Sequence, residues 1–126
     1  MIEKDLFEYL RSNYYPDLVM AKSKISKWDC YSPVQYHRIE LKCRGKHYDE
    51  LLIEKRKFDA MIEKCEDNLD VPYYINYTPE GIYRFNLYKV TPSWFVKKIR
   101  ATTQFIDRTP IDKEIAFLNV IDAEIL

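Results

Sequence analysis

The clearest chemistry in this sequence lies in a Glu and a Lys two positions apart, Glu40 and Lys42, with Asp29 eleven residues before Glu40. Strand side chains alternate between two faces, so Glu40 and Lys42 would share one face of an extended segment, and the apolar residues around them would share the other. Two carboxylates can hold a hard divalent cation such as Mg²⁺ or Mn²⁺, and an adjacent ammonium can orient water or stabilise developing charge. The pattern therefore predicts a metal-dependent site for phosphodiester hydrolysis.

For this site to form, the chain must bring Asp29 next to Glu40. Residues 34–44 have the pattern of a strand, and residues 18–28 are also predicted to be extended. Ser32-Pro33 indicates a turn between the two segments. A hairpin of about ten residues would then place Asp29 and Glu40 on neighbouring strands.

The remaining pattern predicts an α/β fold with a mixed sheet, because helical and extended segments alternate along the chain. Apolar residues at helical spacing predict helices over residues 2–14 and 48–67. Beyond them we expect two strands over residues 71–77 and 82–90 joined by a turn at Thr78-Pro79-Glu80-Gly81, a short helical or irregular segment over 94–100, and a final strand over 114–121.

Two charged residues fall on the apolar stripes of the predicted helices. Lys55 lies between Leu51 and Phe58 on the stripe of residues 48–67, and Glu3 lies on the stripe of the first helix. Lys55 can belong to the site, or it can pack its stem and extend its ammonium into water. Glu3 can join the site, or it can be a first-turn carboxylate stabilised by the helix dipole.

The length and composition are those of one folded domain. The chain has 126 residues and a mass of 15.3 kDa, with 47% hydrophobic and 32% charged residues. We expect one domain over residues 1–126, with a core over about 1–90 and a C-terminal extension over about 91–126.

Three cysteines without a CxxC spacing and two histidines argue against a disulfide framework and a zinc site. No run of ~20 apolar residues and no signal peptide is recognisable, so we expect a cytoplasmic protein without membrane contact.

The net charge is zero, but the charges are unevenly distributed. Residues 22–46 contain seven Lys and Arg against two acidic residues, an excess of +5, whereas residues 112–124 are mainly acidic. A second basic stretch consists of Lys97, Lys98, Arg100 and Arg108. Such polarisation suits the binding of a phosphate backbone, with solvated surface charge as the alternative.

Together these features resemble the PD-(D/E)XK nuclease superfamily over roughly residues 1–90. Its core is a helix, strands bearing an Asp and then (D/E)-x-K, a second helix and a further strand. The resemblance implies a restriction-endonuclease-like α-β-β-β-α-β core, in which helices flank a mixed central sheet. Within the superfamily the chain is most similar to small archaeal-type Holliday junction resolvases and related phage-encoded nucleases. Trp28 stands where the motif has Pro.

The resemblance also implies a role for each candidate residue. The implied metal ligands, for Mg²⁺ or Mn²⁺, are Asp29, Glu40, the Leu41 carbonyl and Glu3. Glu3 matches a Glu that such resolvases carry about ten residues before the end of their first helix. Lys42 would be the catalytic lysine, and Lys55 would correspond to the Lys or Gln that many members direct into the site from the following helix.

We therefore interpret the chain as an Mg²⁺-dependent endonuclease that hydrolyses phosphodiester bonds of nucleic acid, with DNA as the expected substrate. A homodimer would supply the two sites needed to cut both strands, and a phage-encoded nuclease would act in the host cytoplasm. Two alternatives stay open: a nucleic-acid-binding protein of the same fold without turnover, and a protein-interaction module. The eleven tyrosines suit either stacking on bases or sheet packing, and the sequence does not distinguish DNA from RNA.

Overall fold

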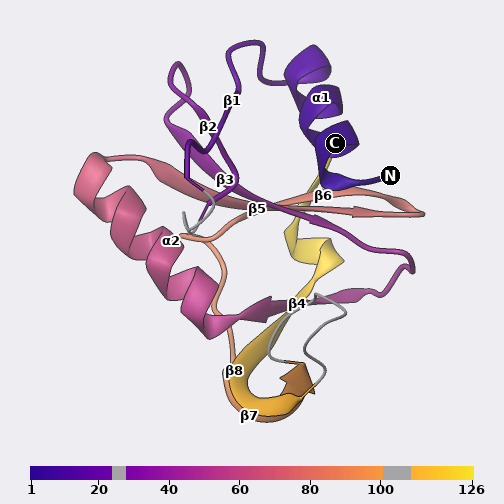
Figure 1. The fold of residues 1–126 in the computed structure, drawn as a ribbon. Coiled ribbons are helices and arrows are strands. Elements are labelled where there is room, and N and C mark those ends of the chain that lie inside the picture. Colours follow the sequence, from indigo (N-terminus) through magenta and orange to yellow (C-terminus); the bar gives the residue numbers. More distant parts are fainter. Residues whose placement is uncertain (24–27, 101–108) are drawn as a thin grey trace.

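The structure is a computed structural model that describes residues 1–23, 28–100 and 109–126 (Figure 1). In chain order its elements are α1 (Glu3–Asn13), β1 (Val19–Met20), β2 (Cys30–Ser32), β3 (His37–Cys43), β4 (Glu50–Glu54), α2 (Lys55–Asn68), β5 (Val71–Thr78), β6 (Gly81–Asn86), β7 (Phe95–Arg100), β8 (Pro110–Asn119), the short 3₁₀ helix η1 (Val120–Asp122) and β9 (Glu124–Ile125).

The central sheet is mixed and has the strand order β1-β2-β3-β5-β6-β9. Strands β3 and β5 are parallel, since the chain crosses between them through β4 and α2, and the other neighbours in this sheet are antiparallel. Helices α1 and α2 cover opposite faces of the sheet (Figure 1). The predicted helix over residues 2–14 and the predicted hairpin of strands around Pro79 are confirmed.

Alternation along β3 assigns its residues to the two faces. Ile39 and Leu41 point toward α1, where they are buried against Leu6 and Leu10 of the helix. Glu40 therefore points to the other side of the sheet, toward α2. The same apolar packing that fixes α1 on the sheet thus orients the charged residues of β3 away from it.

A second sheet of order β4-β8-β7 accounts for two wrong predictions. Residues 48–67 do not form one helix, because Glu50–Glu54 is a strand that pairs with β8 and α2 begins only at Lys55. Leu51 and Ile53 are buried in this strand, and a short apolar run of this kind fits either element until its partner strand is known. Residues 95–100 are likewise a strand rather than helical or irregular, because they pair with β8 along their whole length.

The C-terminal part of the chain belongs to both sheets. Strand β8 extends further toward the N-terminus than the predicted strand over 114–121, and β9 follows it to pair with β6 at the edge of the central sheet. Ile115, Ala116 and Leu118 are buried. Residues 110–125 thus complete the core on the α2 side and close the edge at β6. Of the extended segment predicted over residues 18–28, β1 covers Val19–Met20, and residues 24–27 lie outside the described part of the chain.

Leu69 directly follows helix α2, and its backbone has the left-handed conformation (φ 58°, ψ 37°) while the residue is 88% exposed. This conformation is costly for residues with a Cβ and is the usual place for glycine after a helix. We therefore expect Leu69→Gly to raise the free energy of unfolding by about 1 kcal/mol in chemical denaturation. Leu69→Ala, which shortens the side chain without relieving the backbone, is the matched control, and a glycine variant no more stable than the alanine variant would contradict this account.

Candidate active site

Asp29 and Glu40 meet where β2 and β3 pair. Cys30 is the antiparallel partner of Ile39, so Asp29, the preceding residue, lies opposite Glu40. The backbone N–H of Asp29 donates to the Ile39 carbonyl (2.9 Å), which continues the ladder by one step. The Asp29 carboxylate accepts a hydrogen bond from the backbone N–H of Leu41 at 2.7 Å from Oδ2. The hairpin return expected from the sequence thus brings the two acidic residues together.

Glu40 is a buried carboxylate, 8% exposed, beside another carboxylate. Burial, and then the negative charge of Asp29, raises the pKa of Glu40 from 4.5 to about 7. The Lys57 ammonium acts in the opposite direction, because its Nζ lies 2.9 Å from Glu40 Oε1 in an ion pair. Burial and the charge of Asp29 thus outweigh the Lys57 ion pair, and a bound cation would favour the ionised form of Glu40.

Lys42 lies on the same face of β3 as Glu40 and is half-buried. Burial, and then the positive charges of Arg44 and Lys57, lowers its pKa from 10.5, whereas the carboxylates of Glu3 and Glu54 act to raise it. Among the described residues, no ion pair or side-chain hydrogen bond engages the Lys42 ammonium. Its neighbours on this face of β3 do have such partners, so Lys42 is the cation on this strand that is available to a bound substrate.

Glu3, at the start of α1, adjoins the same group of charges. Burial, and then the negative charge of Asp29, raises the pKa of Glu3, whereas Lys42 and Lys57 lower it. The first turn of α1 therefore lies near the end of β3 that carries the candidate residues. The structure thus brings Glu3 into the electrostatic neighbourhood of Asp29 and Lys42.

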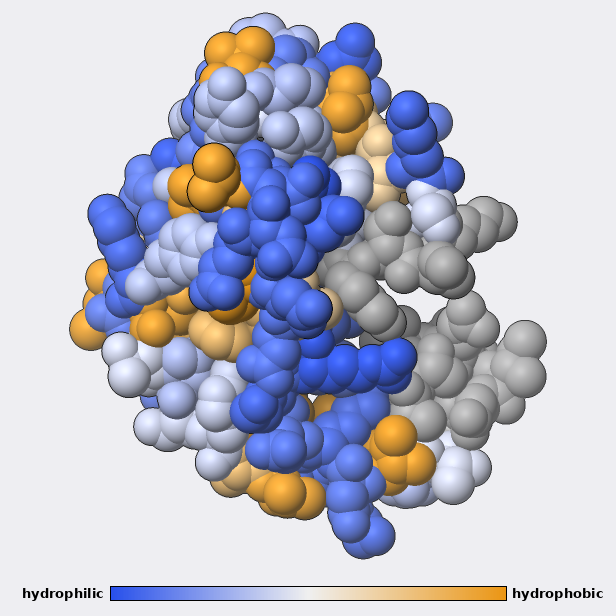
Figure 2. All heavy atoms as spheres, turned by 90° about the vertical axis from the view of Figure 1, so that its left-hand side faces the viewer, coloured by the Kyte–Doolittle hydropathy of each residue, from blue (hydrophilic) through white to orange (hydrophobic). Residues whose placement is uncertain are grey.

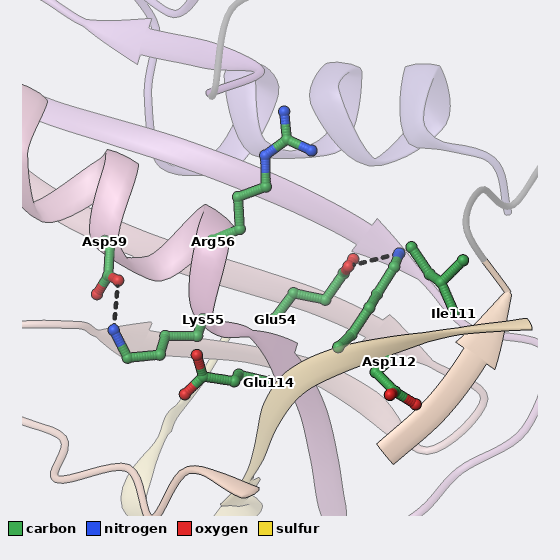
Figure 3. A pocket seen from close by; sticks show the side chains of 8 residues that line it. Glu54, Lys55, Arg56, Asp59, Ile111, Asp112 and Glu114 are labelled. Carbon is green, nitrogen blue, oxygen red and sulfur yellow. Dashed lines mark hydrogen bonds and ion pairs between the residues drawn. The ribbon is translucent and has the colours of Figure 1, made fainter. Parts of the chain in front are cut away.

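The prediction for Lys55 is corrected by the structure. Its ammonium bonds Asp59 at 2.6 Å, one helical turn along α2, and Figure 3 shows the two side chains directed at each other. Lys57 instead reaches Glu40. The physical reason is the start of the helix: since α2 begins at Lys55, the helical face toward the sheet runs through Lys57, Met61 and Cys65. Once the start of α2 is known, this spacing of four residues identifies Lys57 as the lysine on that face.

Glu54 is a second residue that the sequence did not single out. It ends β4 immediately before α2, and its carboxylate acts to raise the pKa of both Lys42 and Lys57. Its Oε1 also forms an ion pair with Lys113 Nζ of β8 at 2.7 Å. Both residues line a hollow of about 400 Å³ between the start of α2 and β8. Figure 3 shows this hollow from close by, with Glu54 beside it. Glu54 thus connects the candidate site to the second sheet.

Trp28, at the position of the motif's Pro, is held by Arg38. The Arg38 guanidinium lies over the rings of Trp28 and Tyr31, at 4.8 Å and 4.5 Å from their centroids. Arg38 itself is anchored by a buried ion pair of 2.7 Å with Asp70, at the junction of α2 and β5. Trp28, directly before Asp29, is thus packed against an anchored guanidinium.

The donor set fits a Mg²⁺ ion, although it is small. Among the described residues, no three His, Cys, Asp or Glu side chains are close enough together to form a metal site on their own. Mg²⁺ needs no more than one or two carboxylates, because it keeps several water ligands and shares the phosphates of its substrate. Asp29 and Glu40 provide two carboxylates, and burial and the charge of Asp29 keep the pKa of Glu40 raised even with Lys57 beside it.

The face of the molecule that carries α2 is strongly hydrophilic in its centre (Figure 2). Of the basic residues in the two stretches noted in the sequence, Lys24, Lys27 and Arg108 lie outside the described residues. Among the described residues, no helix has the length and apolar composition to cross a membrane.

No family model and no curated protein sequence matches the chain. Among solved structures, it is similar to Hjc, a Holliday junction resolvase from the archaeal hyperthermophile Archaeoglobus fulgidus. The TM-score is 0.55 at 14% sequence identity, over 87% of this chain and 84% of that chain. At this identity the similarity concerns the fold. It confirms the predicted fold class, a mixed central sheet flanked by helices as in the nuclease-like fold of Hjc.

Because the pKa of Glu40 is raised, we predict that the protein becomes less stable as the pH rises. Because Glu40 binds its proton more tightly in the folded protein than in the unfolded chain, the free energy of unfolding should decrease as the pH rises from about 4.5 to about 7. Glu40→Gln removes the ionisable group and should therefore become progressively more stable than the wild type across this window, in denaturation without divalent ions. Glu63→Gln, at an exposed position of α2, is the matched control. A constant difference between Glu40→Gln and wild type across the window would show that Glu40 does not titrate in this way.

Proposed function

We propose that this protein is a divalent-metal-dependent nuclease that hydrolyses phosphodiester bonds of DNA. The observation that carries the proposal is the meeting of Asp29 and Glu40 beside Lys42 on a sheet whose fold is similar to that of a Holliday junction resolvase. This arrangement combines a site for a metal cation with a cationic side chain of the protein, and each can stabilise the charge that develops when a phosphodiester is hydrolysed.

Asp29 and Glu40 would hold the metal ion, with the Leu41 carbonyl as a third ligand and Glu3 as a further candidate. When bound, Mg²⁺ or Mn²⁺ would neutralise charge on the phosphate and lower the pKa of a bound water. The hydrogen bond from Leu41 N–H to Asp29 supports the assignment, because it fixes one carboxylate in place while the other is oriented by Lys57.

Lys42 would orient the attacking water and stabilise negative charge as it develops on the phosphate. Its lack of an ion-pair partner among the described residues supports this role, and so does its half-buried position, where a charge acts more strongly than in bulk water. Lys57 would be a positioning residue, since its ammonium holds the Glu40 carboxylate and lowers the proton affinity that burial and Asp29 raise.

Each chain carries one such group of residues, so cutting both strands of a duplex or junction would require two copies or two binding events. The similar structure is a Holliday junction resolvase, and we extend that substrate, branched DNA, to this chain as the first to be tested. A homodimer is the simplest assembly that would provide two sites.

One observation favours the second candidate function, a DNA-binding protein without turnover. The Lys57 ammonium occupies one oxygen of Glu40 at 2.9 Å, and a permanent ion pair there would leave only Asp29 for a metal. Calorimetric titration with Mn²⁺ separates the two functions, because a nuclease of this kind binds the ion through Asp29 and Glu40, and Asp29→Asn and Glu40→Gln abolish the binding.

We expect Lys42→Ala to reduce cleavage of a synthetic four-way DNA junction by ~10²-fold or more, because it removes a charge-stabilising group beside the phosphate. Metal affinity and the free energy of unfolding should change little, since Lys42 is neither a proposed ligand nor in an ion pair. Asp29→Asn with Glu40→Gln, purified identically, controls for contaminating nuclease. Full cleavage by Lys42→Ala above that background would refute the assigned role.

The matched pair Lys57→Met and Lys55→Met tests which lysine of α2 serves the site. Lys57→Met should lower cleavage at least about tenfold and shift its pH profile to higher pH, because the pKa of Glu40 rises further without Lys57. Lys55→Met removes only the ion pair with Asp59 and should leave both the rate and the profile unchanged. Equal effects of the two substitutions would contradict the placement of Lys57.

A further inference from the structure

Two lysines face each other on neighbouring strands of the second sheet. Lys97 of β7 and Lys113 of β8 are directly paired in the antiparallel register. Like charges in this position destabilise a strand pair, and neighbouring pairs in the same ladder avoid it: Lys98 lies opposite Asp112 and forms an ion pair with it at 3.4 Å. Lys97 therefore meets a lysine across the ladder, where its neighbour Lys98 meets an acidic residue.

The two lysines differ in their partners, because Lys113 has an acidic partner next to the candidate site and Lys97 has no ion pair among the described residues. Lys113 pairs with Glu54, and among the described residues no ion pair engages Lys97, which is exposed. Glu54, Lys113 and Lys97 share one face of the second sheet, because Glu54 is paired with Ile115 and alternate residues along β8 point the same way. Since Glu54 also acts on Lys42 and Lys57, this face continues directly from the candidate site.

The part of the sheet that carries Lys97 is a two-stranded ribbon. Strand β4 pairs with β8 only over residues 115–119, whereas β7 pairs with β8 over residues 110–115. The ribbon projects from the body of the molecule past the end of β4 (Figure 1). Strand β7 contributes Lys97, Lys98 and Arg100 and no acidic residue. A two-stranded ribbon has the width that the major groove of a duplex admits.

We propose that the face of the β7–β8 ribbon bearing Lys97 and Lys113 binds the phosphate backbone of duplex DNA beside the scissile bond. This inference rests on the proposed function. It adds the surface on which the duplex that flanks the scissile bond would lie. A phosphate beside Lys97 would neutralise a charge that has no ion-pair partner among the described residues. An acidic protein partner at the same place would do so equally, but the continuity of this face with the proposed phosphodiester site favours the nucleic acid.

The test is binding of a short DNA duplex, followed by fluorescence anisotropy at several salt concentrations without divalent ions, so that no cleavage occurs. Lys97→Ala should weaken binding several-fold and reduce the slope of log Kd against log salt concentration by about 1, the loss of one phosphate contact. Lys97→Glu should weaken binding further. Neither substitution should lower the midpoint of thermal unfolding, because each removes a like-charge pair.

Lys98→Ala is the matched control, since Lys98 is a neighbouring lysine on the opposite face of the same strand. We expect it to keep the wild-type salt slope. Equal salt slopes for Lys97→Ala and Lys98→Ala, in a wild-type protein that binds and cleaves DNA, would overturn this inference and leave the proposed function standing. A wild-type protein without salt-dependent affinity for DNA would overturn both. A fall in unfolding temperature that accompanies the loss of binding would assign Lys97 a structural role and so refute the proposal.

Discussion

The candidate site depends on one unfavourable contact, the approach of two carboxylates of which one is buried. Asp29 and Glu40 lie opposite each other where β2 meets β3, and Glu40 is almost fully covered. Left alone, such a pair would drive one carboxylate to stay protonated, and Glu40 accordingly has a pKa near neutrality, at about 7. The surrounding structure supplies partial compensation through the Leu41 amide, which donates to Asp29, and Lys57, which donates to Glu40.

The face of β3 toward α2 shows how the fold accommodates this charge. It presents Arg38, Glu40 and Lys42 in a row under a helix, where apolar residues would ordinarily lie, and Arg44 follows directly after the strand. Arg38 is neutralised by Asp70, and Arg44 donates to the Asn76 side chain and to the Leu52 carbonyl. Lys42 is left without such a partner among the described residues. Arg38, Glu40 and Arg44 thus have partners within the protein, whereas Lys42 is available to a ligand.

The hairpin that joins Asp29 to Glu40, the two faces of β3 and the α/β class could be predicted from the sequence, because they depend on local alternation and on one turn. That Lys57 rather than Lys55 contacts the site could not be predicted, because this depends on where α2 begins. That boundary is set by the pairing of β4 with β8, whose residues are some sixty positions apart in the chain. The apolar residues Leu51 and Ile53 fit a helix as well as a strand until β8 is in place.

Glu54 and Lys113 were missed for the same reason. Neither lies in a motif, and each gains its neighbours only through the second sheet. The strand β7, predicted as helical or irregular, likewise becomes a strand only through β8, and the Lys97–Lys113 pair is visible only in the register of that ladder. Local pattern thus determined the position of the motif, and non-local strand pairing determined the charged groups that surround it.

The most direct test of the central claim is a crystal structure grown with Mn²⁺, in which anomalous scattering locates the ion independently of the protein atoms. The account predicts one strong anomalous peak bound by the carboxylates of Asp29 and Glu40, with the Lys57 ammonium moved from Glu40 Oε1 or bonded to that oxygen beside the ion. Absence of any peak at these carboxylates, with the Lys57–Glu40 ion pair unchanged at saturating Mn²⁺, would contradict it.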